Sequence, residues 1–201
     1  MKLVYSLTVL LLLACNGLAQ ESSASWFKDC GDHNHFTCDV TLVDQDGRSV
    51  KLYRDLLQGK IVVVQAIFTT CKESCPVMAR RFAVLQDLLG DRVGKEVTLL
   101  SFSVDPETDT PERLKAYAAE MKAKAGWLFL TGKKDNVQWA LHKLGQFVKQ
   151  KEDHLTWFVV GNERAGYWEK VPGLQSPLKT MEAVQRAIRQ VPEATPNAAA
   201  R

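Results

Sequence analysis

Two short, continuous runs of apolar residues restrict the folds open to this chain of 201 residues. IVVVQAIF, residues 61–68, is rich in β-branched side chains, and VTLLSFSV, residues 97–104, is a second such run. Runs of this kind suit strands that are buried on both faces of a sheet, as in the parallel centre of an α/β domain. Between them, apolar residues recur at helical spacing from Pro76 to Leu89, and Gly90 follows. The sequence therefore predicts a strand–helix–strand unit.

Further elements extend this unit in both directions. Residues 40–53 are predicted to form a hairpin that turns at Asp46–Gly47, and residues 155–171 a second hairpin that turns within NERAG. The other predicted elements are a short strand at 127–130 and helices from Pro111, over 134–144 and from Pro177, the last with Met181, Val184 and Ile188 facing inward. This order predicts an α/β fold of the thioredoxin-like type, with a mixed central sheet flanked by helices and an extra N-terminal β-hairpin.

The first 19 residues resemble an export signal. Leu3 to Ala14 is an apolar run that is too short to span a bilayer and follows Lys2. Two cleavage sites compete: one after Ala19, which follows small residues, and one before Cys15, which would make Cys15 a lipid-carrying residue. Either site predicts an exported protein of the bacterial periplasm, and the second predicts a lipid anchor to the membrane.

The rest of the chain is predicted to contain one domain between two polar segments. Residues 20–39 form a tether, 40–191 the thioredoxin-like domain and 192–201 a flexible tail. Without Lys2 the chain has 25 basic and 23 acidic side chains, counted from the 26 and 23 of the full sequence. No basic stripe accompanies this small net charge, so nucleic acid is not an expected partner.

The tether contains a cluster of metal-ligating residue types. CGDHNHFTC packs Cys30, His33, His35 and Cys38 into nine residues. In an oxidising compartment, a Cys30–Cys38 disulfide is one interpretation. The other is an auxiliary copper or zinc site formed by the four residues, although their spacing fits no common zinc pattern.

A second pair of cysteines lies where the first buried strand meets its helix. In FTTCKESCPVM, residues 68–78, Cys71 lies in the loop and Cys75 is predicted at the N-cap of the helix that begins at Pro76. The positive end of a helix stabilises thiolate and lowers the pKa of a cysteine. Three intervening residues distinguish this pair from the two of thioredoxin-type oxidoreductases. Two thiolates would suit Cu(I), and a third ligand would allow Cu(II) as well.

Two histidines of the predicted domain are candidates for that third ligand. His142 falls within the helix over 134–144 and is interpreted as a helix-surface residue. His154 directly precedes a strand, at the rim of the sheet that should face the cysteines. From its position alone, His154 is equally consistent with a metal ligand and with a loop residue bound to backbone.

An acidic segment, DPETDTP, follows the second buried strand and so should lie near the same rim. For Asp109 and Thr110 we favour a turn and a helix N-cap ahead of Pro111. Asp105 is assigned either to an outer-shell hydrogen bond or to a docking surface.

Four segments together resemble the Sco (SenC) family. They are FTTCKESCPVM, DPETDTPERLKAYA, GWLFLTGKKDNV and DHLTWFVVGNERAG, and the resemblance runs from about Val40 to Arg189. It implies a thioredoxin-like, membrane-tethered copper-binding protein in which Cys71, Cys75 and His154 bind one copper ion.

The resemblance also implies a role and partners. The family delivers copper to the binuclear copper site of cytochrome c oxidase, or reduces the cysteines there. The expected partners are the copper-binding subunit of that oxidase and a thiol reductant or another copper carrier. A metallochaperone is expected rather than an enzyme. The rival is a thiol–disulfide oxidoreductase of the cell envelope that uses Cys71 and Cys75 as a redox pair, forming a disulfide when oxidised, without copper.

Overall fold

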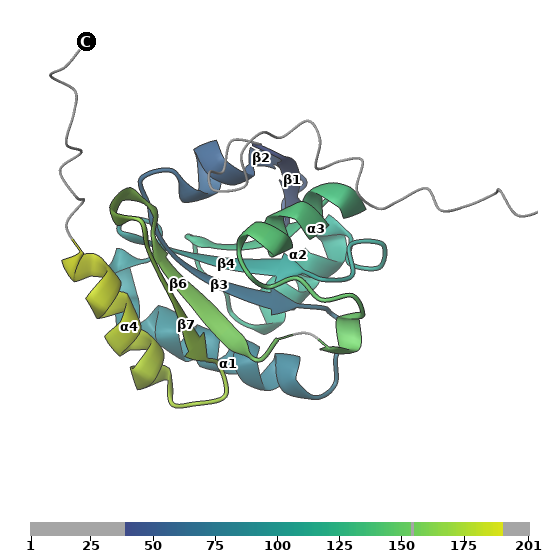
Figure 1. Ribbon diagram of the computed structural model, residues 1–201. Coiled ribbons are helices and arrows are strands. Elements are labelled where there is room, and N and C mark those ends of the chain that lie inside the picture. Colours follow the sequence, from purple (N-terminus) through teal and green to yellow (C-terminus); the bar gives the residue numbers. More distant parts are fainter. Residues whose placement is uncertain (1–38, 154, 191–201) are drawn as a thin grey trace, which may run out of the picture.

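A seven-stranded mixed sheet runs through the centre of the computed structural model, which describes residues 39–153 and 155–190 (Figure 1). The order of strands across the sheet is β2-β1-β5-β4-β3-β6-β7. The strands are β1 Thr41–Asp44, β2 Ser49–Lys51, β3 Ile61–Ile67, β4 Val97–Ser103, β5 Trp127–Thr131, β6 Trp157–Asn162 and β7 Tyr167–Pro172.

The two apolar runs form the middle of this sheet, as predicted. β3 and β4 are parallel over their whole length, from Ile61 opposite Val97 to Ile67 opposite Ser103. β5 pairs parallel with β4. At the two sides of this parallel group, β1 pairs antiparallel with β5, and β6 pairs antiparallel with β3. Both predicted hairpins are present, β1–β2 at one edge and β6–β7 at the other. The α/β, thioredoxin-like prediction with its N-terminal hairpin is thus confirmed.

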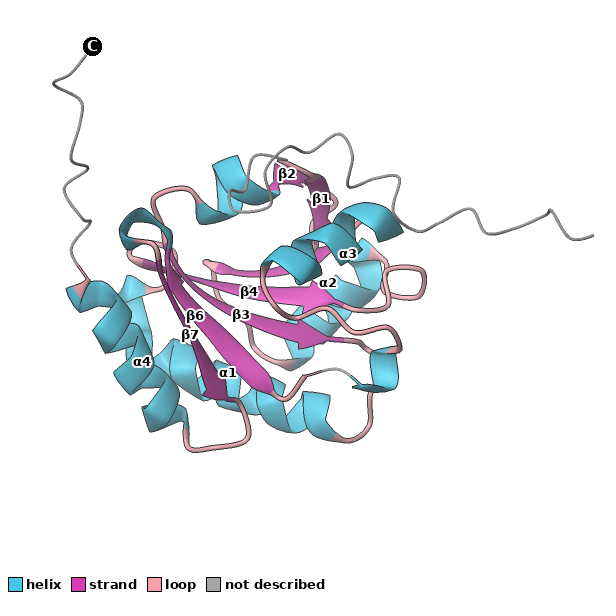
Figure 2. Cartoon of the chain, in the orientation of Figure 1, coloured by secondary structure: helices cyan, strands magenta, loops and turns pink. Residues whose placement is uncertain are grey.

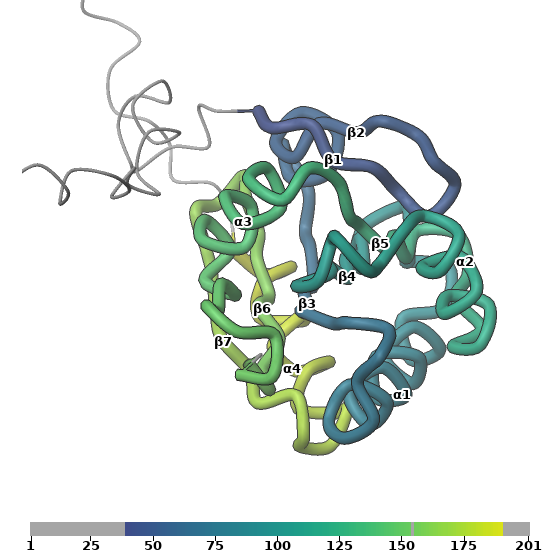
Figure 3. Tube along the Cα trace, turned by 90° about the vertical axis from the view of Figure 1, so that its right-hand side faces the viewer, coloured from purple at the N-terminus to yellow at the C-terminus, as the bar shows by residue number. Residues whose placement is uncertain are grey.

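Helices cover both faces of the sheet (Figures 2 and 3). α1 Ser74–Leu89, α2 Pro111–Glu120 and α4 Pro177–Arg189 share one hydrophobic core with the sheet. On the opposite face, α3 Lys134–Lys143 and a π-helical segment, Leu52–Leu57, enclose a second core. Because β3 and β4 separate these two cores, their side chains are buried on both sides, which explains the absence of polar alternation in their sequences.

Three details differ from the sequence prediction. α1 begins at Ser74, two residues before Pro76. The π-helical segment after β2 was not predicted. α4 buries Ala183, Val184 and Ala187, while Met181 and Ile188 are only partly buried. Small side chains allow close packing of a helix, and here Ala183 and Ala187, with Val184, form the buried stripe of α4. The bulkier Met181 and Ile188 lie at the edges of that stripe.

The described residues contain one unusually close backbone contact. A Cβ atom added at Gly126, just before β5, would lie 2.4 Å from the backbone nitrogen of Gly94. Gly126 also has a φ of +91°, which disfavours any residue with a side chain. Glycine is therefore needed here for two independent reasons. Within the described chain, no helix has the length and apolar character to cross a bilayer.

Candidate metal centre

A tight turn at the end of β3 carries Cys71. β3 ends at Ile67, and the backbone N–H of Cys71 donates a hydrogen bond to the carbonyl oxygen of Phe68 at 3.2 Å. α1 then begins at Ser74, which places Cys75 in the first turn of the helix rather than at its N-cap. The cap residue is Glu73, whose side chain makes no capping hydrogen bond. A strand buried on both faces therefore fixes the point from which the cysteine turn starts.

The structure brings Cys71 and Cys75 together as reduced cysteines. The backbone N–H of Cys75 donates a hydrogen bond to Sγ of Cys71 at 3.4 Å. Cys71 is partly exposed, whereas only 1% of Cys75 is accessible to solvent. The two groups thus lie close together but differ in their access to solvent.

The acidity of Cys75 differs from the sequence expectation. Burial raises the pKa of the Cys75 thiol far above its ordinary value, and the hydrogen bond with Cys71 raises it further. A hydrogen bond with the backbone of Phe68 acts in the opposite direction but does not compensate. The expectation that the helix N-terminus would make this thiol acidic is therefore not met in the metal-free protein, because burial raises the pKa of Cys75.

An open pocket of about 450 Å³ lies beside Cys71. It is lined by Phe68, Thr70, Cys71, Lys72, Glu73, Ser74, Glu152 and Thr156. The last two come from the segment that leads into β6. Because β6 runs antiparallel to β3, the start of β6 lies at the rim where β3 ends. Residue 154 lies outside the described residues, but residues on both sides of it in the sequence line this pocket.

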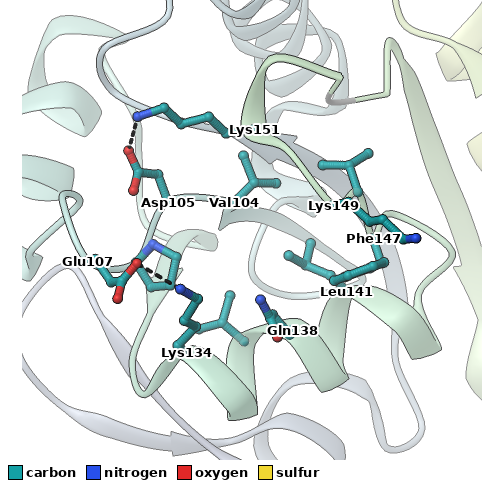
Figure 4. Close-up of a pocket in the computed structure, with 12 residues that line it drawn as sticks. Val104, Asp105, Glu107, Lys134, Gln138, Leu141, Phe147, Lys149 and Lys151 are labelled. Carbon is teal, nitrogen blue, oxygen red and sulfur yellow. Dashed lines mark hydrogen bonds and ion pairs between the residues drawn. The ribbon is translucent and has the colours of Figure 1, made fainter. Parts of the chain in front are cut away.

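Asp105 lies at the same rim, in an ion pair. Its Oδ2 atom is 2.7 Å from Nζ of Lys151, and its side chain is only 12% exposed. The ion pair forms one wall of a second pocket, of about 240 Å³, in which Lys134 and Glu107 form another ion pair at 2.9 Å (Figure 4). Burial alone would raise the pKa of Asp105, but the hydrogen bonds with Lys151 and Thr108 hold it below its ordinary value.

Lys151 lines the second pocket and lies near a residue that lines the first. Its Nζ atom also lies 5.7 Å from the ring centroid of Phe68, the residue that begins the cysteine turn. Lys151 belongs to a 3-10 turn, Lys151–Asp153, that ends next to residue 154. Asp105 therefore contacts the segment that leads to His154 rather than either cysteine. No sequence signal distinguished Lys151 from the other exposed lysines.

The turn and the helix N-cap predicted for Asp109 and Thr110 are both present. Thr110 is the N-cap of α2 and accepts a hydrogen bond from the N–H of Arg113 at 3.4 Å. Asp109 lies in the turn, where its backbone N–H donates a hydrogen bond to the carbonyl of Asp105 at 2.8 Å. Asp109 is also completely buried, and its carboxylate accepts hydrogen bonds from Thr69 and Ser103. The burial of this carboxylate and its contact with Thr69 were not predicted.

His142 lies on the exposed side of α3, as predicted, with its ring stacked on Phe147 at 3.7 Å between centroids. Desolvation lowers its pKa. The other predicted site residues, His154, Cys15, Cys30, His33, His35 and Cys38, lie outside the described residues. Within the described ranges, no group of three or more His, Cys, Asp or Glu residues could hold a metal ion. The described part of the site is thus the cysteine pair.

Comparisons with known proteins agree with this geometry. A model of the SCO1/SenC family matches residues 29–189. A SCO1 protein homolog of Bacillus subtilis is 36% identical over 115 residues, which cover 56% of this chain and 58% of the relative. The chain thus spans little more than half the length of that curated relative.

Two solved structures show the same fold. BsSco, named as a member of the Sco family of cytochrome c oxidase assembly proteins in which a disulfide switch was identified, superimposes with a TM-score of 0.63 at 27% identity, covering 76% of this chain and 92% of that one. Yeast Sco1, solved with copper bound, has a TM-score of 0.63 at 22% identity, covering 77% of this chain and 93% of the other. At that identity the second likeness shows the fold alone.

Proposed function

This chain belongs to the SCO1/SenC family, and from that premise we propose that it is an exported copper chaperone that holds copper through Cys71, Cys75 and His154. The observation that carries the proposal is the adjacent pair of reduced cysteines, Cys71 in the turn before α1 and Cys75 in its first turn, of which Cys71 lines a pocket. The donor set fits the metal: two sulfur ligands suit Cu(I), and an imidazole nitrogen would add affinity for Cu(II).

The pocket suits a protein that passes its metal on. Cys71 lines an opening of about 450 Å³ that a partner's ligands could enter, while Cys75 stays buried behind it. Bound copper would supply charge to keep both sulfurs ionised, which offsets the burial that raises the pKa of the Cys75 thiol. Metal binding and thiol ionisation are therefore expected to be coupled.

His154 is the proposed third ligand. Support comes from the family resemblance and from the lining of the pocket, to which Glu152 and Thr156 contribute on either side of it in the sequence. His142 is the control histidine because it lies on α3, stacked on Phe147.

The partners and location follow from the family. We propose that the recipient is the copper-binding subunit of cytochrome c oxidase, which receives copper or has its cysteines reduced, and that a thiol reductant or another copper carrier acts upstream. An export signal within residues 1–19 would place the protein in the bacterial periplasm, and lipidation of Cys15 would anchor it to the membrane. Residues 20–39 would form the tether, with Cys30, His33, His35 and Cys38 as a disulfide or an auxiliary metal site, ahead of the 40–191 domain and the 192–201 tail.

One observation favours a second candidate function, that of a thiol–disulfide oxidoreductase. A partly exposed Cys71 beside a buried Cys75 has the arrangement of an attacking thiol and a resolving thiol. In that case the pair would turn over a disulfide substrate with no copper present.

Copper stoichiometry on the reduced protein tests the proposal. We expect one Cu(I) per chain in competition with a chromophoric Cu(I) chelator, and loss of tight binding in Cys71→Ser and in Cys75→Ser. His142→Ala serves as the matched control and should bind as the wild type does. Full-affinity Cu(I) binding by either cysteine variant would contradict the assignment. Copper-independent turnover of a disulfide substrate, without tight copper binding, would favour the oxidoreductase.

A further inference from the structure

Asp109 is a buried carboxylate whose hydrogen bonds all reach other segments of the chain. It lies in the loop before α2 and is 0% exposed. Its Oδ1 atom accepts a hydrogen bond from the hydroxyl of Thr69 at 2.5 Å, and its Oδ2 atom accepts one from the hydroxyl of Ser103 at 2.6 Å. The backbone N–H of Thr69 lies 3.2 Å from both oxygens. One side chain thus joins the loop after β3, the end of β4 and the start of α2.

These contacts hold the turn that presents Cys71. Thr69 is the second residue of the turn closed by the N–H of Cys71 and the carbonyl of Phe68. The Asp109 carboxylate restrains Thr69 by accepting hydrogen bonds from both its backbone N–H and its hydroxyl. A third contact comes from the exposed side chain of Arg113, whose Nη2 atom donates a hydrogen bond to the Thr69 hydroxyl at 3.2 Å. The turn is therefore fixed two residues before the sulfur ligand.

The burial of the Asp109 carboxylate is unfavourable for folding, which favours a role for this side chain beyond stability. Transfer of a carboxylate to the protein interior is unfavourable unless hydrogen bonds replace its hydration. Among the described ion pairs, none includes Asp109, so hydroxyl and backbone donors provide this compensation. An apolar residue could have joined the same three segments without a buried charge.

We propose that Asp109 is a positioning residue for the copper site: through Thr69 it fixes the turn that carries Cys71, and its buried negative charge favours Cu(II) over Cu(I) at the neighbouring thiolates. The proposal rests on the proposed copper-binding function. Two thiolates with Cu(I) carry a net charge of −1, whereas two thiolates with Cu(II) are neutral. A fixed negative charge nearby disfavours the form that is itself negative.

Two variants separate positioning from charge, and one provides a matched control. Asp109→Asn keeps the size of the side chain but removes its charge and one of its acceptor oxygens. Thr69→Val keeps the β-branched shape and the charge of Asp109 but removes the hydroxyl that joins them. Glu112→Gln removes an exposed carboxylate from the first turn of α2, and no described hydrogen bond joins Glu112 to Thr69.

Two measurements are made on the full chain. Amide hydrogen exchange on the reduced, metal-free protein should be at least tenfold faster at residues 69–71 in Asp109→Asn and in Thr69→Val, and unchanged in Glu112→Gln. In the copper-loaded protein, one-electron potentiometry should show a higher midpoint for Cu(II)/Cu(I) in Asp109→Asn, by about 59 mV for a tenfold change in relative affinity. Thr69→Val, which keeps the charge, should shift the midpoint less.

The outcomes are distinguishable from failure of the proposed function. Absence of copper binding by the wild type would refute that function, while the exchange measurement would still test the positioning role. A folded Asp109→Asn protein with wild-type exchange at residues 69–71 and a wild-type midpoint would overturn the inference. If Asp109→Asn does not fold, wild-type exchange in Thr69→Val overturns the positioning role.

Discussion

The backbone N–H of Cys75 donates its hydrogen bond to Sγ of Cys71, not the reverse, and only Cys71 reaches solvent. Cys71 therefore receives both the hydrogen bond and the access to solvent, whereas Cys75 is surrounded by protein. This asymmetry leads to the first prediction.

Alkylation should modify Cys71 well before Cys75. We expect iodoacetamide at pH 8 to react at least tenfold faster with Cys71 in the reduced, metal-free protein, because thiolate is the reactive form and burial raises the pKa of Cys75. Peptide mapping by mass spectrometry measures the two rates. In guanidinium chloride the two rates should converge, and equal rates in the folded protein would contradict the asymmetry.

Oxidation should form a Cys71–Cys75 disulfide and release the bound copper. Both sulfurs leave the ligand set together when they bond to each other, so His154 alone could not retain the metal. Mass spectrometry of the oxidised protein identifies the bridge, and gel filtration with metal analysis measures the copper retained. The prediction fails if the main species joins Cys30 or Cys38 to Cys71 or Cys75.

Replacement of His154 by alanine should weaken Cu(II) binding far more than Cu(I) binding. Two thiolates can hold Cu(I) by themselves, whereas Cu(II) favours a tetragonal set with a nitrogen ligand. Sulfur-to-copper charge-transfer absorption during a Cu(II) titration provides the measurement, with His142→Ala as the control. Loss of the absorption in His142→Ala but not in His154→Ala would show that the third ligand is wrongly assigned.

The ion pair between Asp105 and Lys151 should contribute stability that is lost in acid. Hydrogen bonding holds the folded-state pKa of Asp105 below its unfolded value, despite burial. Its contribution is therefore present above the unfolded value of about 3.9 and is lost as the pH falls through the lower, folded-state pKa.

We expect Asp105→Asn to destabilise the protein by about 1 kcal/mol at pH 7, since Lys151 is partly exposed. Urea denaturation of both proteins at a series of pH values measures the difference. A difference that grew toward pH 3 would have the wrong sign.

A methyl group at Gly126 should strongly destabilise the fold. Gly126→Ala places Cβ 2.4 Å from the nitrogen of Gly94 and forces alanine to a φ of +91°. We expect a loss of about 3 kcal/mol in the free energy of unfolding. Gly59→Ala is the control, because it has a φ of +69° but open space around its Cβ, so only about 1 kcal/mol should be lost. Equal losses at the two positions would contradict the role of the close contact.

The elements that could be predicted from the sequence are those determined by local pattern. The apolar runs at 61–68 and 97–104 identified β3 and β4, because burial on both faces requires continuous hydrophobicity. Pro111 and Pro177 correctly predicted the starts of α2 and α4. At α1 the same rule was wrong by two residues, since proline is tolerated throughout the first turn, where backbone N–H groups lack helical partners.

What the sequence did not reveal depends on contacts between distant segments. The carboxylate of Asp109 meets Thr69, forty residues away in the chain, and that direction cannot be read from DPETDTP. Lys151 meets Asp105 only because the antiparallel β6 returns its preceding loop to the rim of β3 and β4. The sequence placed Cys75 close to Cys71, but the burial of Cys75, and hence its raised pKa, depends on the packing of α1 against the sheet.

The antiparallel pairing of β3 with β6 also determines when the site can exist during folding. The pocket beside Cys71 combines residues 68–74 with Glu152 and Thr156, about eighty residues further along the chain. Such sequence-distant contacts form slowly, after the loss of chain entropy that they require. During synthesis, a chain that has not yet paired β6 would display two cysteines without the remaining wall of the pocket. An assembled pocket therefore also signals that β6 has paired with β3.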